Sequence, residues 1–184
     1  MILNSKRLII RNFKDSDIES FLLYRNIPEV AKYQGWKLPY PREAAVQLVD
    51  EMRNIDSPQA GRWLQLMLEL RDTHEVIGDI GIRLKREDPR QAVIGFTLAP
   101  AHWRKGYMTE AVVTILGFLF DVLNLHRVSA DCDTENIASW RTLEKAGFRR
   151  EAHFVENYPM GDFYAREYIY SMLQREWQAG KTPG

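Results

Sequence analysis

The order of hydrophobic and polar positions divides the chain into alternating strand-like and helix-like segments. Short apolar runs, continuous or alternating, are typical of strands, and apolar residues three and four positions apart are typical of helices. The strand pattern occurs in Lys6–Phe13, Trp63–Leu70, Val76–Leu84, Ala92–Leu98, Arg127–Asp133, Phe148–Val155 and Tyr164–Leu173. The helix pattern occurs in Ser16–Asn26, Arg42–Asn54, Thr109–Asn124 and Glu135–Ala146, and a short helical end is expected from Gln174.

Residues with special turn chemistry separate these segments. Ser16 and Glu19 have the spacing of a capping box, so the first helix is expected to begin there. The stretch Lys32–Pro41 contains glycine and proline residues and is expected to be a loop. Gly147 follows the last long helix at the position where a left-handed residue commonly ends a helix.

The order of the segments predicts one α/β domain. A chain of 184 residues has the usual size of a single domain, so residues 1–184 are assigned to one unit. The polar stretch RDTHE between the second and third strands predicts a hairpin, whereas later strands alternate with helices. A mixed sheet with helices on both faces, of the α+β kind, accommodates both patterns. The short, apolar Ala92–Leu98 is expected at its centre.

The composition limits the cellular location and the classes of binding partner that we expect for the protein. Lys and Arg number 25, as do Asp and Glu, so the formal charge is zero, and we expect neither nucleic acid nor membrane as a partner. No apolar run approaches the ~20 residues that a membrane span needs, and the N-terminus lacks the shape of a signal peptide. The single cysteine, Cys132, fits a cytoplasmic protein. The histidines lack metal-ligand spacing with Cys132, so no metal is expected.

The turn after the central strand has the composition of an anion-binding loop. Arg104 and Lys105 precede Gly106, and Thr109 opens the following helix. The first N–H groups of a helix have no internal partner and the helix dipole is positive there, so a phosphate group is a suitable ligand. The alternative is an ordinary strand-to-helix turn with a solvated pair of charges. The sequence contains no glycine-rich dinucleotide or P-loop motif.

A second polar group follows the strand Arg127–Asp133. Asn136, Ser139 and Leu143 are spaced to share roughly one face of the helix Glu135–Ala146. An amide and a hydroxyl near the start of this helix suit an extended polar ligand. The alternative is that Asn136 only caps the helix.

Together, these two segments resemble the GNAT superfamily of acyl-CoA N-acyltransferases. The resemblance is carried by WRKGYMTEA, at residues 103–111, followed by N-x-x-S-x-x-x-L-E-K-x-G-F, at residues 136–148. The opening RLIIRNFKDSDIESFLLYRN, the loop KYQGW and the ending YIYSMLQREW resemble the branch that includes the bacterial ribosomal-protein N-terminal acetyltransferases. The resemblance extends over nearly the whole chain.

The resemblance implies a splayed pair of central strands with acetyl-CoA, the cosubstrate, between them. The gap would lie between Ala92–Leu98 and Arg127–Asp133. The pyrophosphate would bind the backbone of Arg104–Thr109, and the pantetheine arm would pair with Phe96–Leu98 like an added strand. The residues implied in cofactor binding are Phe96, Thr97, Leu98, Arg104, Lys105, Gly106, Tyr107, Met108, Thr109, Asn136 and Ser139.

The resemblance also implies catalytic residues, and some positions depart from the family pattern. Glu156, in the loop VENYPMGD, resembles the branch's catalytic glutamate and is assigned as the base, with a solvated loop carboxylate as the alternative. Ser139 matches a serine that acts as the acid, a role that a hydroxyl fills only as a donor or relay. Leu143 stands where many relatives have a tyrosine as general acid. Trp103 and Met108 replace the usual Gln or Arg and the usual Gly or Ala.

The implied reaction moves an acetyl group from a thioester to a primary amine. The amine must be neutral to attack, so a base is required, and the backbone N–H near Leu98 is assigned to the developing oxyanion. Tyr33 and Trp36 either wall the acceptor pocket or anchor their loop over the sheet. The acceptor is either a protein N-terminus or a small molecule, and a homodimer is expected because relatives often pair. The alternative function is a CoA-binding sensor or scaffold without turnover.

Overall fold

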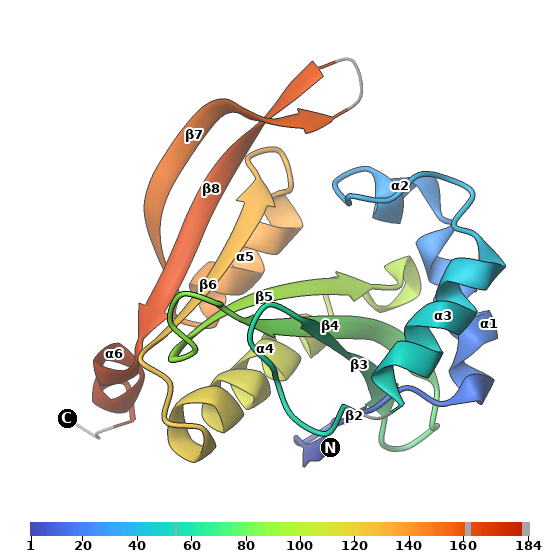
Figure 1. Cartoon of the computed structure of the whole chain (residues 1–184), viewed down its shortest axis with the longest axis horizontal. Coiled ribbons are helices and arrows are strands. Elements are labelled where there is room, and N and C mark those ends of the chain that lie inside the picture. The colour runs from blue at the N-terminus through green and yellow to red at the C-terminus, as the bar shows by residue number, and fades with distance from the viewer. Residues whose placement is uncertain (54, 161–162, 182–184) are drawn as a thin grey trace.

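The protein is built on one eight-stranded mixed sheet (Figure 1). The computed structural model describes residues 1–53, 55–160 and 163–181. The strands stand in the order β1-β2-β3-β4-β5-β6-β8-β7, in which β5 and β6 run parallel and the other neighbours antiparallel. Their bounds are β1 Ile2–Asn4, β2 Leu8–Arg11, β3 Trp63–Leu70, β4 Val76–Leu84, β5 Gln91–Leu98, β6 Arg127–Asp133, β7 Arg149–Met160 and β8 Phe163–Leu173. The predicted mixed α/β architecture and the β3–β4 hairpin are confirmed.

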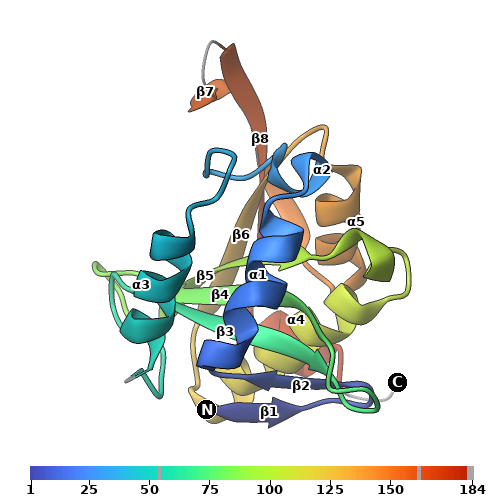
Figure 2. The same ribbon diagram turned by 90° about the vertical axis from the view of Figure 1, so that its right-hand side faces the viewer.

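Helices cover both faces of this sheet. Figures 1 and 2 show α1 and α3 side by side over β3 and β4, with α4 on the opposite face. The helices are α1 Ile18–Arg25, α2 Pro28–Ala31, α3 Arg42–Met52, α4 Tyr107–Gly117, α5 Ile137–Lys145 and α6 Gln174–Ala179. Short 3₁₀ turns occupy Asp15–Asp17 and Pro100–His102, and a π-helical turn, Phe118–Val122, continues α4.

The two central parallel strands diverge soon after they begin. β5 pairs with β6 only over Gln91–Val93, opposite Arg127–Ser129. At the point of divergence, Ser129 Oγ donates a hydrogen bond to the carbonyl oxygen of Ala92 at 3.2 Å. Beyond it, β5 stays paired with β4 as far as Leu98, and β6 with β8 as far as Asp133. The outer pairings therefore hold the two strand ends apart, which confirms the predicted splayed pair.

Several element boundaries differ from the predicted ones. The helix α4 begins at Tyr107 rather than Thr109, because the left-handed Gly106 serves as its N-cap. The strand β7 continues to Met160, so Glu156 lies in a strand and not in the predicted loop. The short elements β1 and α2 were not predicted. The predicted helix end at Asn54 and residues 161–162 of the predicted loop VENYPMGD lie outside the described residues.

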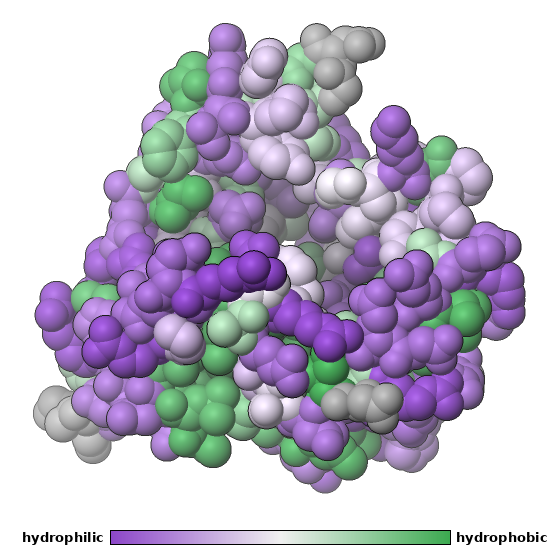
Figure 3. Space-filling view, viewed as in Figure 1, coloured by the Kyte–Doolittle hydropathy of each residue, from purple (hydrophilic) through white to green (hydrophobic). Residues whose placement is uncertain are grey.

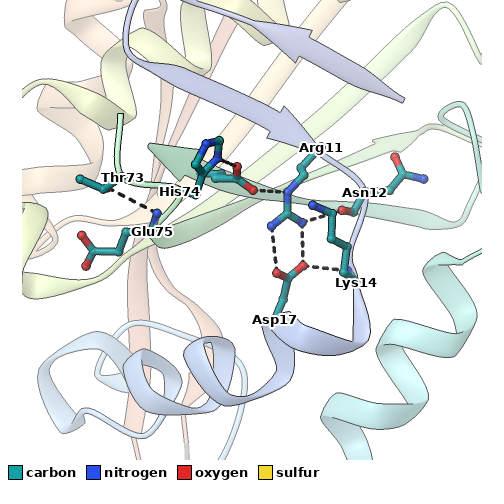
Figure 4. A network of polar contacts seen from close by, with 8 residues as sticks. Arg11, Asn12, Lys14, Asp17, Thr73, His74 and Glu75 are labelled. Carbon is teal, nitrogen blue, oxygen red and sulfur yellow. Dashed lines mark hydrogen bonds and ion pairs between the residues drawn. The ribbon is translucent and has the colours of Figure 1, made fainter. Parts of the chain in front are cut away.

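The predicted capping box at Ser16 is wrong. Asp17 accepts instead, from the backbone N–H of Lys14 at 2.7 Å. Its carboxylate is fixed by Arg11, whose Nη1 and Nη2 donate to Asp17 at 2.7 and 2.9 Å. Figure 4 shows this guanidinium facing Asp17. Arg11 Nε also donates to a second carboxylate, that of Glu69, which contacts His74 Nδ1 at 2.7 Å. Buried charges are tolerated only when paired in this way, so the cluster ties β2, β3 and α1 together.

Candidate functional site

The loop before α4 presents a row of backbone N–H groups. Arg104 and Gly106 have φ angles of 62° and 79°, left-handed conformations that turn the chain sharply into the helix. Within the described residues, no hydrogen bond has as its donor the backbone N–H of Arg104, Lys105, Gly106, Tyr107, Met108 or Thr109. Glu110 is the first residue of the helix to donate, to the Gly106 carbonyl at 3.1 Å. Backbone N–H groups rarely stay unpaired, and several in succession at a helix N-terminus suit an anion such as a phosphate.

The edge of β5 beyond the divergence offers further backbone groups. Ala99 donates its N–H to Ile77 of the neighbouring chain segment at 2.8 Å. Because backbone groups alternate in direction along a strand, those of Phe96 and Leu98 point away from β4, towards the side from which β6 has departed. Such an edge can pair with an extended ligand as if with another strand.

Trp103 limits how far such pairing extends. Its indole Nε1 donates to the carbonyl oxygen of Leu98 at 2.7 Å, although the ring itself is exposed. The sequence identified Trp103 only as a departure from the family pattern, in place of the usual Gln or Arg. In the structure it occupies the last carbonyl of β5, which leaves the Leu98 N–H and both groups of Phe96 for a ligand.

The gap between β5 and β6 beyond Val93 and Ser129, where the two strands diverge, is called the wedge. The start of α5 follows β6, its second strand. Asn136 caps this helix, because its Oδ1 accepts from the Ser139 N–H at 3.2 Å. The cap occupies the amide oxygen, whereas the amide NH₂ donates no hydrogen bond within the described residues. Asn136 can therefore cap the helix and contact a ligand at the same time. The side chain of Ser139 neighbours Cys132 on β6, where burial raises the pKa of the thiol to about 12 and the hydrogen bond with the serine opposes this shift.

Leu143, one helix turn further along α5, is fully buried. It packs in the core, and a hydrocarbon side chain carries no proton. A tyrosine-like general acid is consequently absent from this position, as the sequence indicated.

Tyr33 and Trp36 belong to the loop between α2 and α3. The Tyr33 hydroxyl donates to the carbonyl of Glu135 at 3.4 Å, so this loop reaches the start of α5. Trp36 donates from Nε1 to the Arg25 carbonyl at 3.2 Å, and the Arg25 guanidinium stacks on its ring at 4.1 Å. Those contacts make Trp36 an anchor of the loop, whereas Tyr33 extends over the end of the wedge.

The sequence analysis missed a buried polar cluster beneath this loop. Asp79 of β4 is fully buried and accepts hydrogen bonds from Tyr24, Arg25 and Gln65. It pairs with Thr97 of β5, so the cluster lies beside the diverging end of that strand. The signal was present in IGDIG, where a single carboxylate interrupts an apolar strand. Its contacts tie α1 to the sheet at the level of the wedge.

Glu156 lies on β7, which forms an exposed arm with β8 (Figure 1). Its φ of 54° is left-handed, which is uncommon for a residue other than glycine, and it falls where the β7–β8 register shifts between Phe154 and Tyr158. Bulges of this kind redirect side chains and often accompany functional sites. Figure 3 shows the molecular surface hollowed between this arm and the segments around α2. A Cβ added to Gly35 would lie 3.8 Å from the Tyr158 hydroxyl, so the loop reaches the arm.

The structure brings some predicted site residues together and leaves others apart. The loop Arg104–Thr109, the edge of Phe96–Leu98, Asn136 and Ser139 all flank the wedge, and Tyr33 contacts the residue before Asn136. No contact joins Glu156 to Ser139 in the described structure. Within residues 1–53, 55–160 and 163–181, no three acidic, histidine or cysteine side chains form a group suited to a metal ion. In the same part of the chain, no helix is long and apolar enough to cross a bilayer.

The chain is similar to known acetyltransferases. The model of the acetyltransferase (GNAT) domain matches residues 7–149. An uncharacterised N-acetyltransferase of Bacillus subtilis, YoaA, is 34% identical over 151 residues, which cover 82% of this chain and 84% of the relative.

Solved structures share the fold. The crystal structure of a GNAT-family acetyltransferase from Bacillus anthracis superposes with a TM-score of 0.84 at 29% identity, covering 95% of this chain and 99% of that one. A spermidine N-acetyltransferase from Vibrio cholerae, solved with CoA and spermine, superposes with a TM-score of 0.80 at 20% identity, covering 95% and 99%. At that identity the second comparison bears on the fold alone.

Proposed function

The chain belongs to the GNAT family of acetyltransferases, and from this premise we propose that it transfers the acetyl group of acetyl-CoA to a primary amine at the wedge between β5 and β6. The proposal rests chiefly on one observation: the diverging edge of β5 is followed, after one 3₁₀ turn, by a loop whose successive N–H groups have no partner in the described part of the chain. An extended thioester with a diphosphate at its far end matches both features.

The residues of the wedge suit this cosubstrate. Arg104–Thr109 would hold the pyrophosphate, because the free N–H groups and the positive end of α4 favour negative charge. Phe96 would pair with the pantetheine arm through its N–H and C=O, and the free amide NH₂ of Asn136 would donate to that arm. When bound, acetyl-CoA supplies the activated acetyl group. The protein positions this group, removes a proton from the amine and delivers one to the sulfur.

Proton removal is the main chemical task for the protein. An α-amino group has a pKa of about 8 and an alkylamine one of about 10.4, so either is largely protonated near neutral pH. We assign Glu156 as the base that takes this proton, directly or through water. Its left-handed backbone at the register shift of β7 gives its carboxylate a direction different from that of the regular strand. The Leu98 N–H would stabilise negative charge developing on the carbonyl oxygen. Once the N–C bond to the acetyl carbon forms, the nitrogen becomes acidic, and Ser139 would relay its proton to the departing sulfur as the C–S bond breaks, since Leu143 carries no acidic proton.

The acceptor is proposed by class. A primary amine is common to a protein N-terminus and to a polyamine, and either amine must lose a proton before it can attack. Tyr33, which extends over the end of the wedge, is the proposed wall of the acceptor site, together with the loop that Trp36 anchors. A cytoplasmic location and a homodimer complete the proposal.

The test is an assay of free CoA release across a panel of peptides and small amines. With a turned-over acceptor, Glu156→Gln is expected to lower kcat/KM about 100-fold or more at pH 7. The difference in kcat/KM between Glu156→Gln and wild type should become smaller as the pH rises through the pKa of the amine, because the acceptor then loses its proton to the solvent. Glu87→Gln is the matched control, since this exposed carboxylate lies in the turn at the opposite end of β4 and β5.

Two results would contradict parts of the proposal. An equal rate for Glu156→Gln at every pH would remove Glu156 from the role of base. Tight CoA binding without turnover of any acceptor would favour the sensor or scaffold function instead.

A further inference from the structure

Arg7 reaches across the molecule to the loop that precedes α4. It lies in the short connection between β1 and β2, far from that loop in the sequence. Its Nη1 donates to the carbonyl oxygen of Lys105 at 2.9 Å, and its guanidinium stacks on the ring of Tyr107 at 4.4 Å. A Cβ built on Gly106 would have Arg7 Nη2 as its nearest neighbour, at 3.5 Å. The Arg7 side chain thus contacts Lys105 and Tyr107 and lies beside Gly106 between them.

Glu110 holds Arg7 in this position. Its Oε2 accepts from Arg7 Nε at 2.6 Å, and its Oε1 accepts from the Arg7 backbone N–H and from Ser5 Oγ, both at 2.7 Å. Although burial opposes ionisation, these bonds from Ser5 and Arg7 lower the pKa of Glu110. The carboxylate therefore stays charged at neutral pH and fixes the β1–β2 connection against the first turn of α4.

From these contacts we propose that Arg7 is a positioning residue for diphosphate binding: it aims the N–H of Gly106 by holding the carbonyl of Lys105. The peptide bond is planar and trans, so its C=O and N–H point in opposite directions. When Arg7 draws the Lys105 oxygen towards itself, the Gly106 N–H is turned to the other side, away from the guanidinium. This inference rests on the proposed function, because it assumes that the loop binds the diphosphate of CoA.

The chemistry of the side chain explains why an arginine is suited to this role. A planar guanidinium can donate to Glu110 and to Lys105 at the same time while it stacks on Tyr107, whereas an ammonium group has no fork and no face to stack. Its charge also remains close to the loop. The Glu110 carboxylate offsets part of that charge, which leaves orientation of the peptide as the main contribution of Arg7.

The experiment compares two acetyl donors in wild-type protein and in Arg7→Gln. The KM for acetyl-CoA is expected to rise about tenfold or more, the effect of losing a charged hydrogen bond. The KM for S-acetylpantetheine, which lacks the diphosphate, should stay within about twofold of wild type. Direct titration with CoA should show the same loss of affinity without any turnover. Arg7→Lys should recover only part of it, because it restores the charge but not the fork.

A matched control separates positioning of the loop from general support of the β1–β2 connection. Arg71 donates from Nη1 to the Ser5 carbonyl at 2.8 Å, in the same connection, but has no contact with the loop among the described residues. Arg71→Gln is expected to leave the affinity for CoA unchanged.

Each outcome has a distinct meaning. Unchanged KM and CoA affinity in Arg7→Gln would overturn the inference. An equal loss with both donors would overturn it too, because Arg7 would then support the fold and not the diphosphate. If the wild-type protein neither bound CoA nor used acetyl-CoA, the proposed function itself would fail.

Discussion

Gly106 offers the sharpest test of the loop, because its conformation has a definite energetic consequence. Its φ of 79° is left-handed, which costs an L-residue roughly 1–2 kcal/mol. Steric conflict with the protein adds little, because the only non-adjacent atom of the described residues within 4 Å of an added Cβ is Arg7 Nη2 at 3.5 Å, an ordinary contact. Gly106→Ala should therefore lose about 1–2 kcal/mol in total. Asp at this position would add a negative charge beside the phosphates.

That loss can appear in either of two measurements. If the loop of Gly106→Ala keeps its conformation, the free energy of unfolding in urea falls by the full amount. If the loop relaxes, stability is retained and the ligand must restore the strained conformation, which weakens CoA binding by about 5- to 30-fold. The two losses, measured by urea titration and by calorimetry with CoA, should sum to about 1–2 kcal/mol.

Gly117 provides the matched control within the same helix. Its φ of −57° and ψ of −46° are ordinary for a helix, and an added Cβ would meet Asp121 and Trp177 at 3.7 Å. Gly117→Ala should gain about 0.5–1 kcal/mol of stability and leave CoA affinity unchanged. If Gly106→Ala lost neither stability nor affinity, the left-handed turn would not be needed to present the N–H groups.

Three further substitutions test the fold and the chemistry. Asp17→Asn breaks a buried ion pair with Arg11 and should lower the free energy of unfolding by about 3–5 kcal/mol in a urea titration. Arg127 lowers the pKa of Glu151 to about 2, below its unfolded value, so this carboxylate stabilises the protein above the unfolded pKa and less as the pH falls towards 2. Wild type should therefore lose more stability than Glu151→Gln between pH 5 and pH 2 in thermal melts. Ser139→Ala should slow turnover about tenfold or more, and its urea midpoint should stay near that of wild type. A wild-type rate would exclude the relay.

The sequence predicted the regular parts of the fold because periodicity reports burial on one face. Leu8 and Ile10, at alternate positions of the predicted strand Lys6–Phe13, are both fully buried. Gly147 has a φ of 94°, as expected of a left-handed helix cap, and the Phe148 N–H closes the end of α5 on Leu143 at 3.0 Å. These features depend on neighbouring residues alone, so a single sequence is sufficient to predict them.

The features that the sequence missed depend on partners distant in the chain. Glu156 looked like a loop residue because its surroundings are polar, yet pairing with β8 carries the strand through it. The contact of Glu110 with Arg7 is visible only once β1 and β2 are placed beside α4. Trp103 likewise gains its role from the Leu98 carbonyl. Which N–H groups are left without partners is a property of the whole sheet, and periodicity does not report it.

The wedge persists because closing it would disrupt better pairings elsewhere. Moving β5 towards β6 would pull it from β4, with which it pairs along its length to Leu98, and moving β6 would pull it from β8. The new ladder would form on the free edge of each strand at the expense of the ladder on its other edge, so it would replace bonds and not add to them. Ser129 fixes the point where the strands part, and Trp103 takes the last carbonyl of β5. The backbone groups between these two points can then be satisfied only by water or by an extended ligand, which makes the binding site a consequence of the sheet's own hydrogen bonding.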